Sequence, residues 1–389
     1  MKVLHVITGL HAGGAEQQLR LLLRHMPEGV HSEVVALTNP GVVADGLRAD
    51  GIRVAHLGMR GNRDVAALRR LTREIRAARP DLVHCHLYRA CVYGRPAARL
   101  AGVRTVLATE HSLLGDVLEG RRVNAGARLL YRATERLGRM TVAVSPDTAG
   151  HLAAWGIPRD RITVLPNGVD LARHLVPASA RAAQRLLLRE ELGIPGESWT
   201  LGGVGRLVPG KRFDLLVRVL AQLPERARLL LVGAGPEREP LQRLAAGLGV
   251  ADRVVFAGER ADVPEMLYAM DALAAPSEGE TFGLVLLEGL AAGLPVLWTN
   301  GPALAGLPPE EIPQAPRLPA TVAAYAAAAA ELMTAPAHGR RPPDVLQDYD
   351  VARIAPKLAS LYRTLLGDVP PPRALDREAR PQTTEEIHA

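Results

Sequence analysis

Two glutamates, Glu280 and Glu288, bracket an apolar segment within the run S-E-G-E-T-F-G-L-V-L-L-E-G-L-A-A-G-L-P-V. The segment stays free of proline until Pro295, a pattern that predicts a loop, a helix, a turn and a strand. With the helix beginning near Gly283, Glu280 lies in the preceding loop. Glu288 then lies about one and a half turns inside the helix, with its side chain leaning back toward the N-terminus. We therefore expect both carboxylates to face one helix N-terminus.

The free N–H groups at such a helix N-terminus favour an anion. Together with the two carboxylates they suit a ligand that has phosphate in its middle and hydroxyl groups at both ends, which is the layout of a nucleotide-sugar. Along an ideal helix, eight residues span roughly 12 Å, so the two carboxylates are too far apart for an acid/base pair that acts on one bond. An ordinary amphipathic helix with a solvated glutamate at each end is the alternative that spacing alone leaves open.

Cations for a diphosphate are available in the run G-V-G-R-L-V-P-G-K-R, which contains Arg206 and Lys211. Gly205 to Lys211 matches the start of a Walker A loop, G-x-x-x-x-G-K. Arg212, however, stands where Ser or Thr should hold Mg²⁺, and Pro209 lacks an N–H group that the phosphates need. We therefore interpret Arg206 and Lys211 as two cations that flank a diphosphate.

Two loops of the N-terminal half carry further candidates. Gly13 and Gly14 follow the first predicted strand and precede a helix, as a phosphate-cradling loop does. Their spacing is not G-x-G-x-x-G, which disfavours an NAD site. The run A-T-E-H-S is predicted to end a strand and to present Glu110 and His111 to a ligand, and a surface histidine at a strand–loop junction is the alternative.

Two motifs that resemble metal sites are better explained without a metal. His84, Cys85, His86 and Cys91 have ligand-type side chains, but strand alternation places His84 and His86 on one face and Cys85 on the other. The motif D-Y-D, which ends at Asp350, resembles the Asp-x-Asp of Mg²⁺-dependent sugar transfer. It stands just before the last predicted helix, where an N-cap is the simpler explanation. We expect no metal.

Runs typical of buried strands alternate with helical patterns twice along the chain. The first series begins at Lys2 and closes at the turn-rich P-N-G-V-D, and the second begins at Trp199. This pattern predicts an α/β fold of two Rossmann-like, doubly wound domains with a ligand cleft between them, at the carboxyl ends of both sheets. The predicted parts are a first domain (1–172), a linker with a helix (173–198), a second domain (199–349), a last helix (350–366) and a disordered, Pro-rich tail (367–389).

Composition excludes several classes of protein. The 389 residues suit two domains, and the two cysteines imply no disulfide framework and a reducing, cytoplasmic location. The net charge is +6, but only three of the 47 basic residues are lysines, and the arginines are spread among acids without interleaved aromatics. Nucleic-acid binding is therefore not expected. No apolar run approaches the ~18 residues that a membrane-spanning helix needs.

Five motifs, taken in order along the chain, resemble those of the retaining glycosyltransferases of family 4, which have the GT-B fold. They are G-G-A-E after the first strand, T-E-H, P-N-G-V-D, G-R-L-x-x-x-K and E-x-F-G-L-x-x-x-E-x-x-A-x-G-x-P-V, and the last is the most specific. The resemblance extends from Met1 to about Leu366. It implies transfer of a sugar from a nucleotide-sugar to an acceptor hydroxyl without a metal or other cofactor. It also implies an acceptor-side first domain, a nucleotide-sugar-binding second domain and a last helix that crosses back onto the first.

The resemblance also implies a role for each candidate residue. Carried over by position, it implies that Arg206 and Lys211 clamp the diphosphate and that Glu288 contacts the ribose. Glu280 and the backbone of Phe282, Gly283 and Leu284 would contact the donor sugar, and His111 would bond a sugar hydroxyl near the anomeric centre. Gly13 and Gly14 would form the loop that approaches the phosphate and the acceptor. Two departures affect the outer wall of the donor site. Arg212 follows Lys211 where glycine is usual, and L-W-T-N-G-P-A-L-A-G-L follows Val296 in place of a Gly-rich, acid-bearing segment.

A finer resemblance concerns the acceptor. The Arg- and Ala-rich composition and the run H-L-Y-R-A-C-V-Y-G-R resemble actinobacterial transferases of aminoglycoside pathways. This implies transfer of a hexose or aminohexose, from a UDP-sugar, to a 2-deoxystreptamine pseudodisaccharide. Carboxylates for such a cationic acceptor are available at Glu16, Glu110, Asp116 and Glu119.

Two other functions remain open. A basic amphipathic pattern at Arg121–Arg139 indicates a transferase with a lipid or cell-envelope acceptor, in weak peripheral contact with a membrane surface. The same motifs also fit a non-enzymatic module that only binds a nucleotide-sugar. In each case the expected partners are small molecules, with no nucleic acid and no obligate protein partner.

Overall fold

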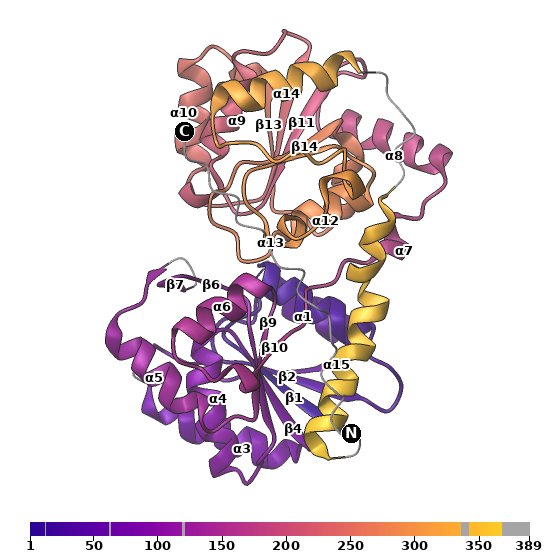
Figure 1. The fold of residues 1–389 in the computed structure, drawn as a ribbon. Coiled ribbons are helices and arrows are strands. Elements are labelled where there is room, and N and C mark those ends of the chain that lie inside the picture. Colours follow the sequence, from indigo (N-terminus) through magenta and orange to yellow (C-terminus); the bar gives the residue numbers. More distant parts are fainter. Residues whose placement is uncertain (12, 62–63, 119–120, 336–341, 368–389) are drawn as a thin grey trace.

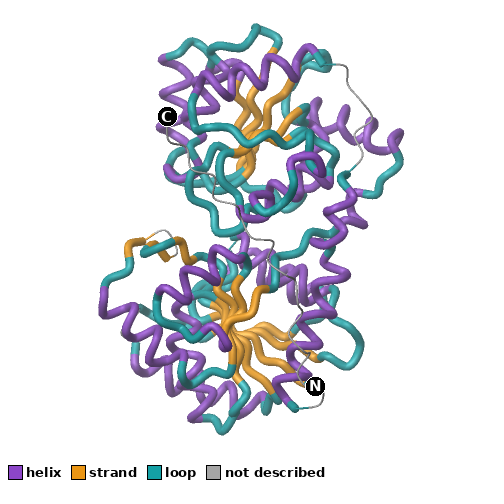
Figure 2. Tube along the Cα trace, in the orientation of Figure 1, coloured by secondary structure: helices purple, strands orange, loops and turns teal. Residues whose placement is uncertain are grey.

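The computed structural model describes residues 1–11, 13–61, 64–118, 121–335 and 342–367 (Figure 1). Two separate parallel sheets are each flanked by helices, and they form the two halves of the molecule in Figure 2. The expectation of two doubly wound α/β domains is therefore confirmed. The tail that sequence predicts to be disordered lies, beyond Gly367, outside the described residues.

The N-terminal sheet has the strand order β10-β9-β5-β4-β1-β2-β3, and every pair in it is parallel. Its strands are β1 (Lys2–Ile7), β2 (His31–Ala36), β3 (Arg53–His56), β4 (Leu82–His86), β5 (Val106–Glu110), β9 (Met140–Ala143) and β10 (Ile162–Val164). The helices are α1 (Gly14–Arg24), α2 (Gly41–Ala49), α3 (Val65–Ala78), α4 (Tyr88–Leu100), α5 (Ala125–Glu135) and α6 (Pro146–Ala154). Every residue of β4 and β5 is buried, as expected for central strands covered on both faces.

The second sheet has the order β13-β12-β11-β14-β15 and is also parallel throughout. Its strands are β11 (Trp199–Val204), β12 (Ala227–Val232), β13 (Val254–Gly258), β14 (Ala272–Ala275) and β15 (Val296–Trp298). The helices are α9 (Phe213–Leu220), α10 (Arg238–Gly247), α11 (Val263–Met266), α12 (Leu284–Ala291), α13 (Pro302–Ala305) and α14 (Val322–Thr334). Strands β11 and β14 are parallel neighbours, so their carboxyl ends lie at the same edge of the sheet. The candidate residues that follow these two strands therefore meet at that edge.

The predicted basic helix at Arg121–Arg139 is shorter than expected. Residues Arg121–Arg122 form β8, the last strand of a small antiparallel sheet with β6 (Leu113–Leu114) and β7 (Val117–Leu118). Helix α5 begins only at Ala125, because the Asn124 side chain accepts a hydrogen bond from the Ala127 N–H at 2.8 Å. None of the described helices combines the length and apolar character needed to span a bilayer.

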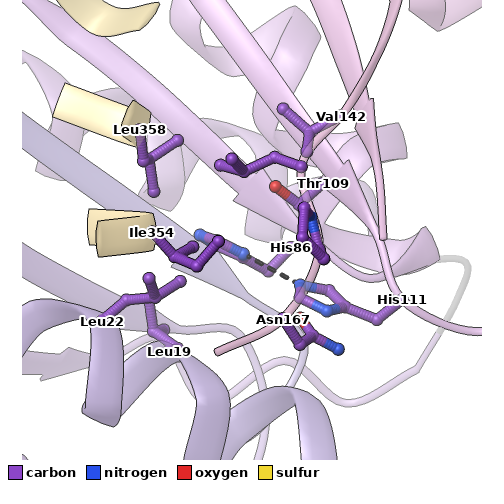
Figure 3. A pocket seen from close by; sticks show the side chains of 11 residues that line it. Leu19, Leu22, His86, Thr109, His111, Val142, Asn167, Ile354 and Leu358 are labelled. Carbon is purple, nitrogen blue, oxygen red and sulfur yellow. Dashed lines mark hydrogen bonds between the residues drawn. The ribbon is translucent and has the colours of Figure 1, made fainter. Parts of the chain in front are cut away.

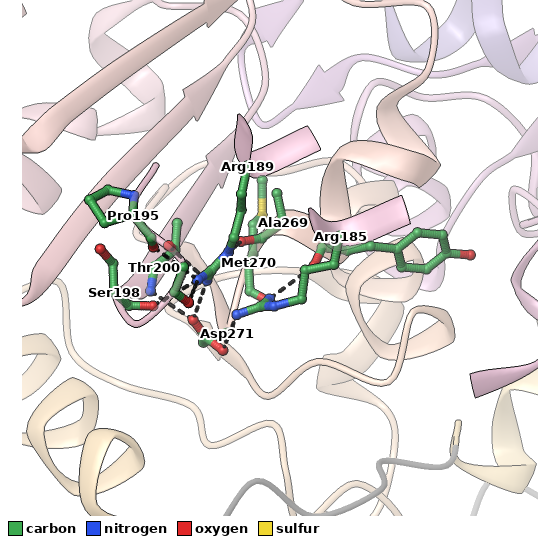
Figure 4. Close-up of polar contacts among 10 residues, drawn as sticks. Arg185, Arg189, Pro195, Ser198, Thr200, Ala269, Met270 and Asp271 are labelled. Carbon is green, nitrogen blue, oxygen red and sulfur yellow. Dashed lines mark hydrogen bonds and ion pairs between the residues drawn. The ribbon is translucent and has the colours of Figure 1, made fainter. Parts of the chain in front are cut away.

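Helices α7 (Leu171–His174) and α8 (Ala178–Glu191) connect the two sheets, and α8 is fastened to the second one. The buried Arg189 donates to Asp271 at 2.8 Å and to the carbonyls of Ala269, Gly196 and Ser198 (Figure 4). Arg185 donates to the other oxygen of Asp271, also at 2.8 Å. A buried guanidinium is tolerated here because its N–H groups are paired with a carboxylate and backbone oxygens.

The last helix, α15 (Val351–Leu366), runs along the N-terminal sheet although it follows the second domain in sequence (Figure 1). Asp350 caps it by accepting from the Ala352 N–H at 3.0 Å, which explains the D-Y-D motif structurally. Ile354, Leu358 and Tyr362 on its apolar face are buried in one cluster with residues of β1, β4, β5 and β9, among them Val3, Leu82, Leu107 and Val142.

Candidate active site

Helix α12 begins where the sequence places it. Gly283 is the N-cap residue, with φ 91° and ψ 50°, a left-handed conformation that favours glycine. A Cβ atom at this position would lie 3.0 Å from Leu286 Cδ1, so any other residue would also require the Leu286 side chain to shift by a few tenths of an ångström. The Phe282 side chain is 4% exposed and packs in the core beside Tyr349. The Phe282 side chain is therefore not available to a ligand, and the contact of its backbone with a donor sugar stays a prediction.

Lys211 and Glu280 meet beside this helix N-terminus. The Lys211 ammonium donates to a Glu280 carboxylate oxygen, and both side chains are mostly shielded from solvent. Their loops are tied together by Ser277, whose hydroxyl donates to the Gly210 carbonyl at 2.9 Å. Arg206, the second predicted cation, is exposed after β11. The roles proposed for these residues toward a ligand stay predictions.

Arg212, where the resemblance leads us to expect glycine, adopts a left-handed backbone conformation. Its φ of 54° and ψ of 37° lie in the left-handed region, between the short 3₁₀ turn Pro209–Lys211 and α9. The guanidinium approaches Glu278 at 3.4 Å and Asp214 at 3.5 Å. Arg212 therefore allows the turn to form and adds contacts with two carboxylates at the surface.

Glu288 lies within α12, about one turn after Leu284, the first residue of the helix. Burial raises the pKa of the Glu288 carboxyl to about 7, and the positive charge of Arg173 opposes this shift. A carboxyl that is partly protonated near neutral pH both donates and accepts hydrogen bonds. This chemistry suits a hydroxyl-bearing group such as ribose, although the contact itself stays a prediction.

The two domains touch at the site through hydrogen bonds of Thr281. Its hydroxyl donates to the His111 carbonyl at 2.7 Å, and its own carbonyl accepts from the Ser145 hydroxyl at 3.1 Å. Nearby, a Cβ atom on Gly14 would lie 3.8 Å from Leu284 Cδ1, so α1 and α12 present their N-terminal ends to each other. Gly13 is the N-cap residue of α1. The structure thus brings His111, Gly14 and the Glu280 loop to one place.

His111 lines a small cavity of about 20 Å³ together with His86, Thr109 and Asn167 (Figure 3). Its Nε2 atom lies 3.3 Å from His86 Nδ1. Burial lowers the pKa of His111 to about 4, so the ring is neutral at neutral pH. His84 and His86 share one face of β4, as the strand alternation predicts, while Cys85 lies on the other face.

The expectation that Glu110 reaches a ligand is wrong. Its side chain is fully buried, and one carboxylate oxygen accepts from the Ser112 N–H at 3.0 Å while the other accepts from the Tyr131 hydroxyl at 3.4 Å. Successive residues of a strand point to opposite faces, so β5 directs Glu110 toward α5. Of the other acids suggested for a cationic acceptor, Asp116 is exposed and approaches Arg128 at 4.0 Å, and Glu119 lies outside the described residues.

One group of described side chains has the composition of a metal site. The ring nitrogens of His5, His84 and His86 lie within 4.8 Å of one another. However, His84 already bonds the Tyr362 hydroxyl at 2.8 Å and the Thr109 hydroxyl at 2.7 Å. Coordination by His84 would break one of these bonds, so the arrangement favours a hydrogen-bonded cluster. The expectation of a metal-free site stays a prediction.

Sequence reasoning did not identify Ser145 and Thr281 as contacts between the domains. Ser145 precedes Pro146 and caps α6, a role that the dipeptide signals. Nothing in the local sequence, however, indicates that the same hydroxyl reaches the second domain. His5 was missed for the same reason, because only the alignment of β1 with β4 places it beside His84.

Two family profiles match the chain. The profile described as Glycosyltransferase Family 4 matches residues 12–173, and that described as Glycosyl transferases group 1 matches residues 184–310. The D-inositol 3-phosphate glycosyltransferase of Nocardia farcinica is 36% identical over 245 residues, which cover 56% of this chain and 51% of that protein. The GDP-mannose-dependent alpha-(1-6)-phosphatidylinositol monomannoside mannosyltransferase of Mycobacterium tuberculosis is 35% identical over 217 residues, covering 53% and 54%. The chain thus spans about half the length of the curated relatives it matches.

Solved structures share the fold over most of the chain. The crystal structure of Anabaena Alr3699/HepE in complex with UDP-glucose has a TM-score of 0.79 at 22% identity, covering 94% of this chain and 100% of that one. Sucrose-phosphate synthase from Thermosynechococcus elongatus has a TM-score of 0.73 at 21% identity, covering 95% and 100%. These matches confirm the GT-B fold. Each domain matches one of the two profiles, so the chain is similar to family 4 glycosyltransferases over its first domain and to group 1 glycosyl transferases over its second.

Proposed function

We propose that the protein transfers a hexose or aminohexose from a nucleoside diphosphate sugar to a hydroxyl group of a cyclitol-containing acceptor, with retention of the anomeric configuration. Relatives named for D-inositol 3-phosphate support a cyclitol acceptor. The finer form of the proposal is a 2-deoxystreptamine pseudodisaccharide, which contains an aminocyclitol, and it rests on the sequence resemblance alone. UDP is the proposed nucleotide, in keeping with the UDP-glucose bound to the Anabaena neighbour.

The observation that carries the proposal is the meeting of the α12 N-terminus, Lys211 and Glu280 with His111 of the other domain. A departing diphosphate gains negative charge as the glycosidic bond breaks. Fixed cations and free helix N–H groups stabilise that charge in the transition state. In the proposed complex Lys211 and Arg206 bind the diphosphate, and Glu280, released from Lys211, binds hydroxyl groups of the donor sugar.

The general and the finer form of the proposal differ only in the acceptor that they name. Mass spectrometry of products from the purified chain, with UDP- and GDP-sugars and a set of cyclitol acceptors, tests them directly. A product with a 2-deoxystreptamine pseudodisaccharide supports the finer form, and a product with inositol 3-phosphate alone restricts the proposal to phosphorylated cyclitols. Turnover with none of the cyclitols, in the presence of a working lipid acceptor, overturns both. Nucleotide-sugar binding without any turnover favours the binding-module alternative.

A lipid acceptor at a membrane surface is the second candidate, and α5 favours it. Leu129 and Leu130 on this helix are 65% and 47% exposed. Arg128 is a poor probe of this surface, because it donates to the Ala154 carbonyl and lies over the Trp155 ring. The double variant Leu129→Glu/Leu130→Glu should therefore abolish co-sedimentation with anionic vesicles if α5 binds them.

A matched control for the vesicle experiment is available on α8. Leu186 and Leu187 are 65% and 67% exposed there, far from α5 in Figure 1. The variant Leu186→Glu/Leu187→Glu introduces the same charge. If both double variants reduce sedimentation equally, binding is nonspecific and the second candidate loses its support.

A further inference from the structure

Three buried histidines form a hydrogen-bonded row beneath the site. His5 Nδ1 on β1 lies 3.1 Å from His86 Nε2 on β4, and His86 Nδ1 lies 3.3 Å from His111 Nε2 after β5. His5 and His86 are each 1% exposed, and His111 is 9% exposed. Figure 3 shows the His86 and His111 rings joined in this way at the cavity. The row therefore connects the sheet interior to the candidate active site.

The row permits only two arrangements of its hydrogens. A neutral imidazole carries one N–H, and each of the two bonds needs one hydrogen. Burial lowers the pKa of His5 to about 3 and that of His86 well below its usual value, so a doubly protonated middle ring is disfavoured. All three rings must then donate in the same direction along the row.

The two directions differ at the ends. Within the described part of the chain, His5 Nε2 and His111 Nδ1 have no hydrogen-bond partner. One direction leaves an N–H on His5 Nε2, an unpaired donor in the interior of the sheet. The other leaves the N–H on His111 Nδ1, which is equally buried, but His111 lines the cavity in Figure 3, so a ligand oxygen that enters there can accept it. An unpaired buried donor is costly, so the second direction is favoured.

We propose that His86 and His5 are positioning residues that hold His111 as a neutral ring with its hydrogen on Nδ1, so that it donates to an oxygen of the bound ligand. The role of the ligand in this inference rests on the proposed function, whereas the position of the hydrogen does not. His111 would then recognise an acceptor atom, such as a sugar or phosphate oxygen. A general base at His111 Nδ1 is incompatible with this assignment.

Two features of the surroundings hold His86 in place. Leu87, the next residue, has φ 71° and ψ 160°, a region that residues other than glycine rarely adopt and that marks functional sites when it occurs. The His84 ring lies 4.0 Å from the His86 ring and is itself fixed by bonds to Tyr362 and Thr109. The strained turn and the braced neighbour keep His86 directed at His111.

Nitrogen NMR of the full chain, labelled with ¹⁵N-histidine, tests the assignment without relying on activity. In the wild type at neutral pH, we expect His111 as a single neutral tautomer with hydrogen on Nδ1. His86→Leu should give a mixture of both tautomers. His86→Asn should restore the single tautomer, because its amide N–H can donate to His111 Nε2 from the place of the lost Nδ1. His174→Leu is the control, since it removes another buried histidine, on α7 and outside the row, and should leave His111 unchanged.

The outcomes that overturn the inference are equally direct. A wild-type His111 that carries its hydrogen on Nε2, that populates both tautomers or that is charged at neutral pH contradicts it. So does a His86→Leu protein with the wild-type pattern. If His86→Leu does not fold, His86→Met replaces it, because methionine likewise cannot donate to His111 Nε2 and should yield the same mixture.

Kinetics then connect the tautomer to sugar transfer. Loss of a positioning partner commonly costs about 10- to 100-fold, so His86→Leu should lower kcat by that factor with little change in the donor KM, and His86→Asn should recover most of it. A confirmed tautomer in a chain that transfers no sugar would leave this inference standing and remove the proposed function. Normal transfer by His86→Leu, together with the mixed tautomer, would show that the hydrogen on His111 Nδ1 is not used.

Discussion

Lys211 and Glu280 bind each other at the N-terminus of α12, although the sequence assigns them to different parts of a ligand. Lys211 comes from the turn after β11 and Glu280 from the loop after β14, two neighbouring strands of the second sheet. In the absence of a diphosphate, the carboxylate neutralises the ammonium that would bind it. Ligand binding must therefore compete with this ion pair.

Glu280→Gln should separate nucleotide binding from sugar transfer. The substitution removes the charge that competes for Lys211, so we expect UDP to bind several-fold more tightly, as measured by calorimetry. Transfer should nevertheless fall by about 10²-fold, because the carboxylate no longer holds the donor sugar. Weaker UDP binding by this variant would show that Glu280 assists the diphosphate site.

Lys211→Ala should reduce the rate of transfer by about 10²- to 10³-fold, the usual cost of losing one group that stabilises transition-state charge. Lys357→Ala is the matched control, since Lys357 is exposed on α15. Initial rates at saturating donor distinguish the two variants. Equal rates for wild type and Lys211→Ala would remove Lys211 from the diphosphate site.

The order of the helices and strands could be predicted from the sequence to a large extent. The predicted last helix, 350–366, agrees with α15 to within one residue, and α12 begins after Gly283 as expected. These elements have strong apolar periodicity or clear end signals. Helix α14, with the sequence V-A-A-Y-A-A-A-A-A-E-L-M-T, was not predicted, because its many alanines give little contrast between its faces.

Pairings between distant side chains could not be predicted from the sequence. Glu110 is turned away from the site because it accepts a hydrogen bond from Tyr131, far along the chain. The row from His5 to His111 forms only because three strands are aligned in one register. Local patterns specify the type of each element but not which side chains face each other across the sheet. The residues suited to the ligand were therefore predicted as separate motifs, whereas their mutual contacts required the structure.

Removal of metal ions tests the proposed electrostatics of the site. Because Arg206, Lys211 and the α12 N-terminus supply positive charge, we expect treatment with EDTA to leave the transfer rate within about twofold of the untreated enzyme. The measurement is the initial rate before and after dialysis, with and without added Mg²⁺. Loss of activity that Mg²⁺ restores would mean that the two cations do not suffice for the diphosphate.

Arg189 should be important for stability and not for the chemistry. Arg189→Met removes the donor to several buried carbonyls and one donor to Asp271, which keeps its bond to Arg185, so we expect a loss of about 1 to 3 kcal/mol in the free energy of unfolding. Arg218→Met, at an exposed position of α9, is the control. Denaturant titration measures both, and a loss below about 1 kcal/mol for Arg189→Met would contradict the structural role.

Glu288 should make stability depend on pH. Because burial raises the pKa of the folded-state carboxyl from 4.5 to about 7, the folded protein binds this proton more tightly than the unfolded chain. The associated stabilisation is fully present below pH 4.5 and is lost as the pH rises to about 7. Each pKa unit corresponds to about 1.4 kcal/mol, so the total change is at most about 3.5 kcal/mol.

Glu288→Gln isolates this effect, because glutamine keeps the shape of the side chain and does not titrate. The difference in the free energy of unfolding between wild type and variant, from denaturant titrations at pH 4.5, 6 and 7.5, should change steadily in favour of the variant. A bound nucleotide whose ribose contacts Glu288 should reduce that change, because the hydroxyl groups would stabilise the ionised carboxylate. A difference that is constant across this range would mean that the Glu288 carboxyl has an ordinary pKa in the folded protein.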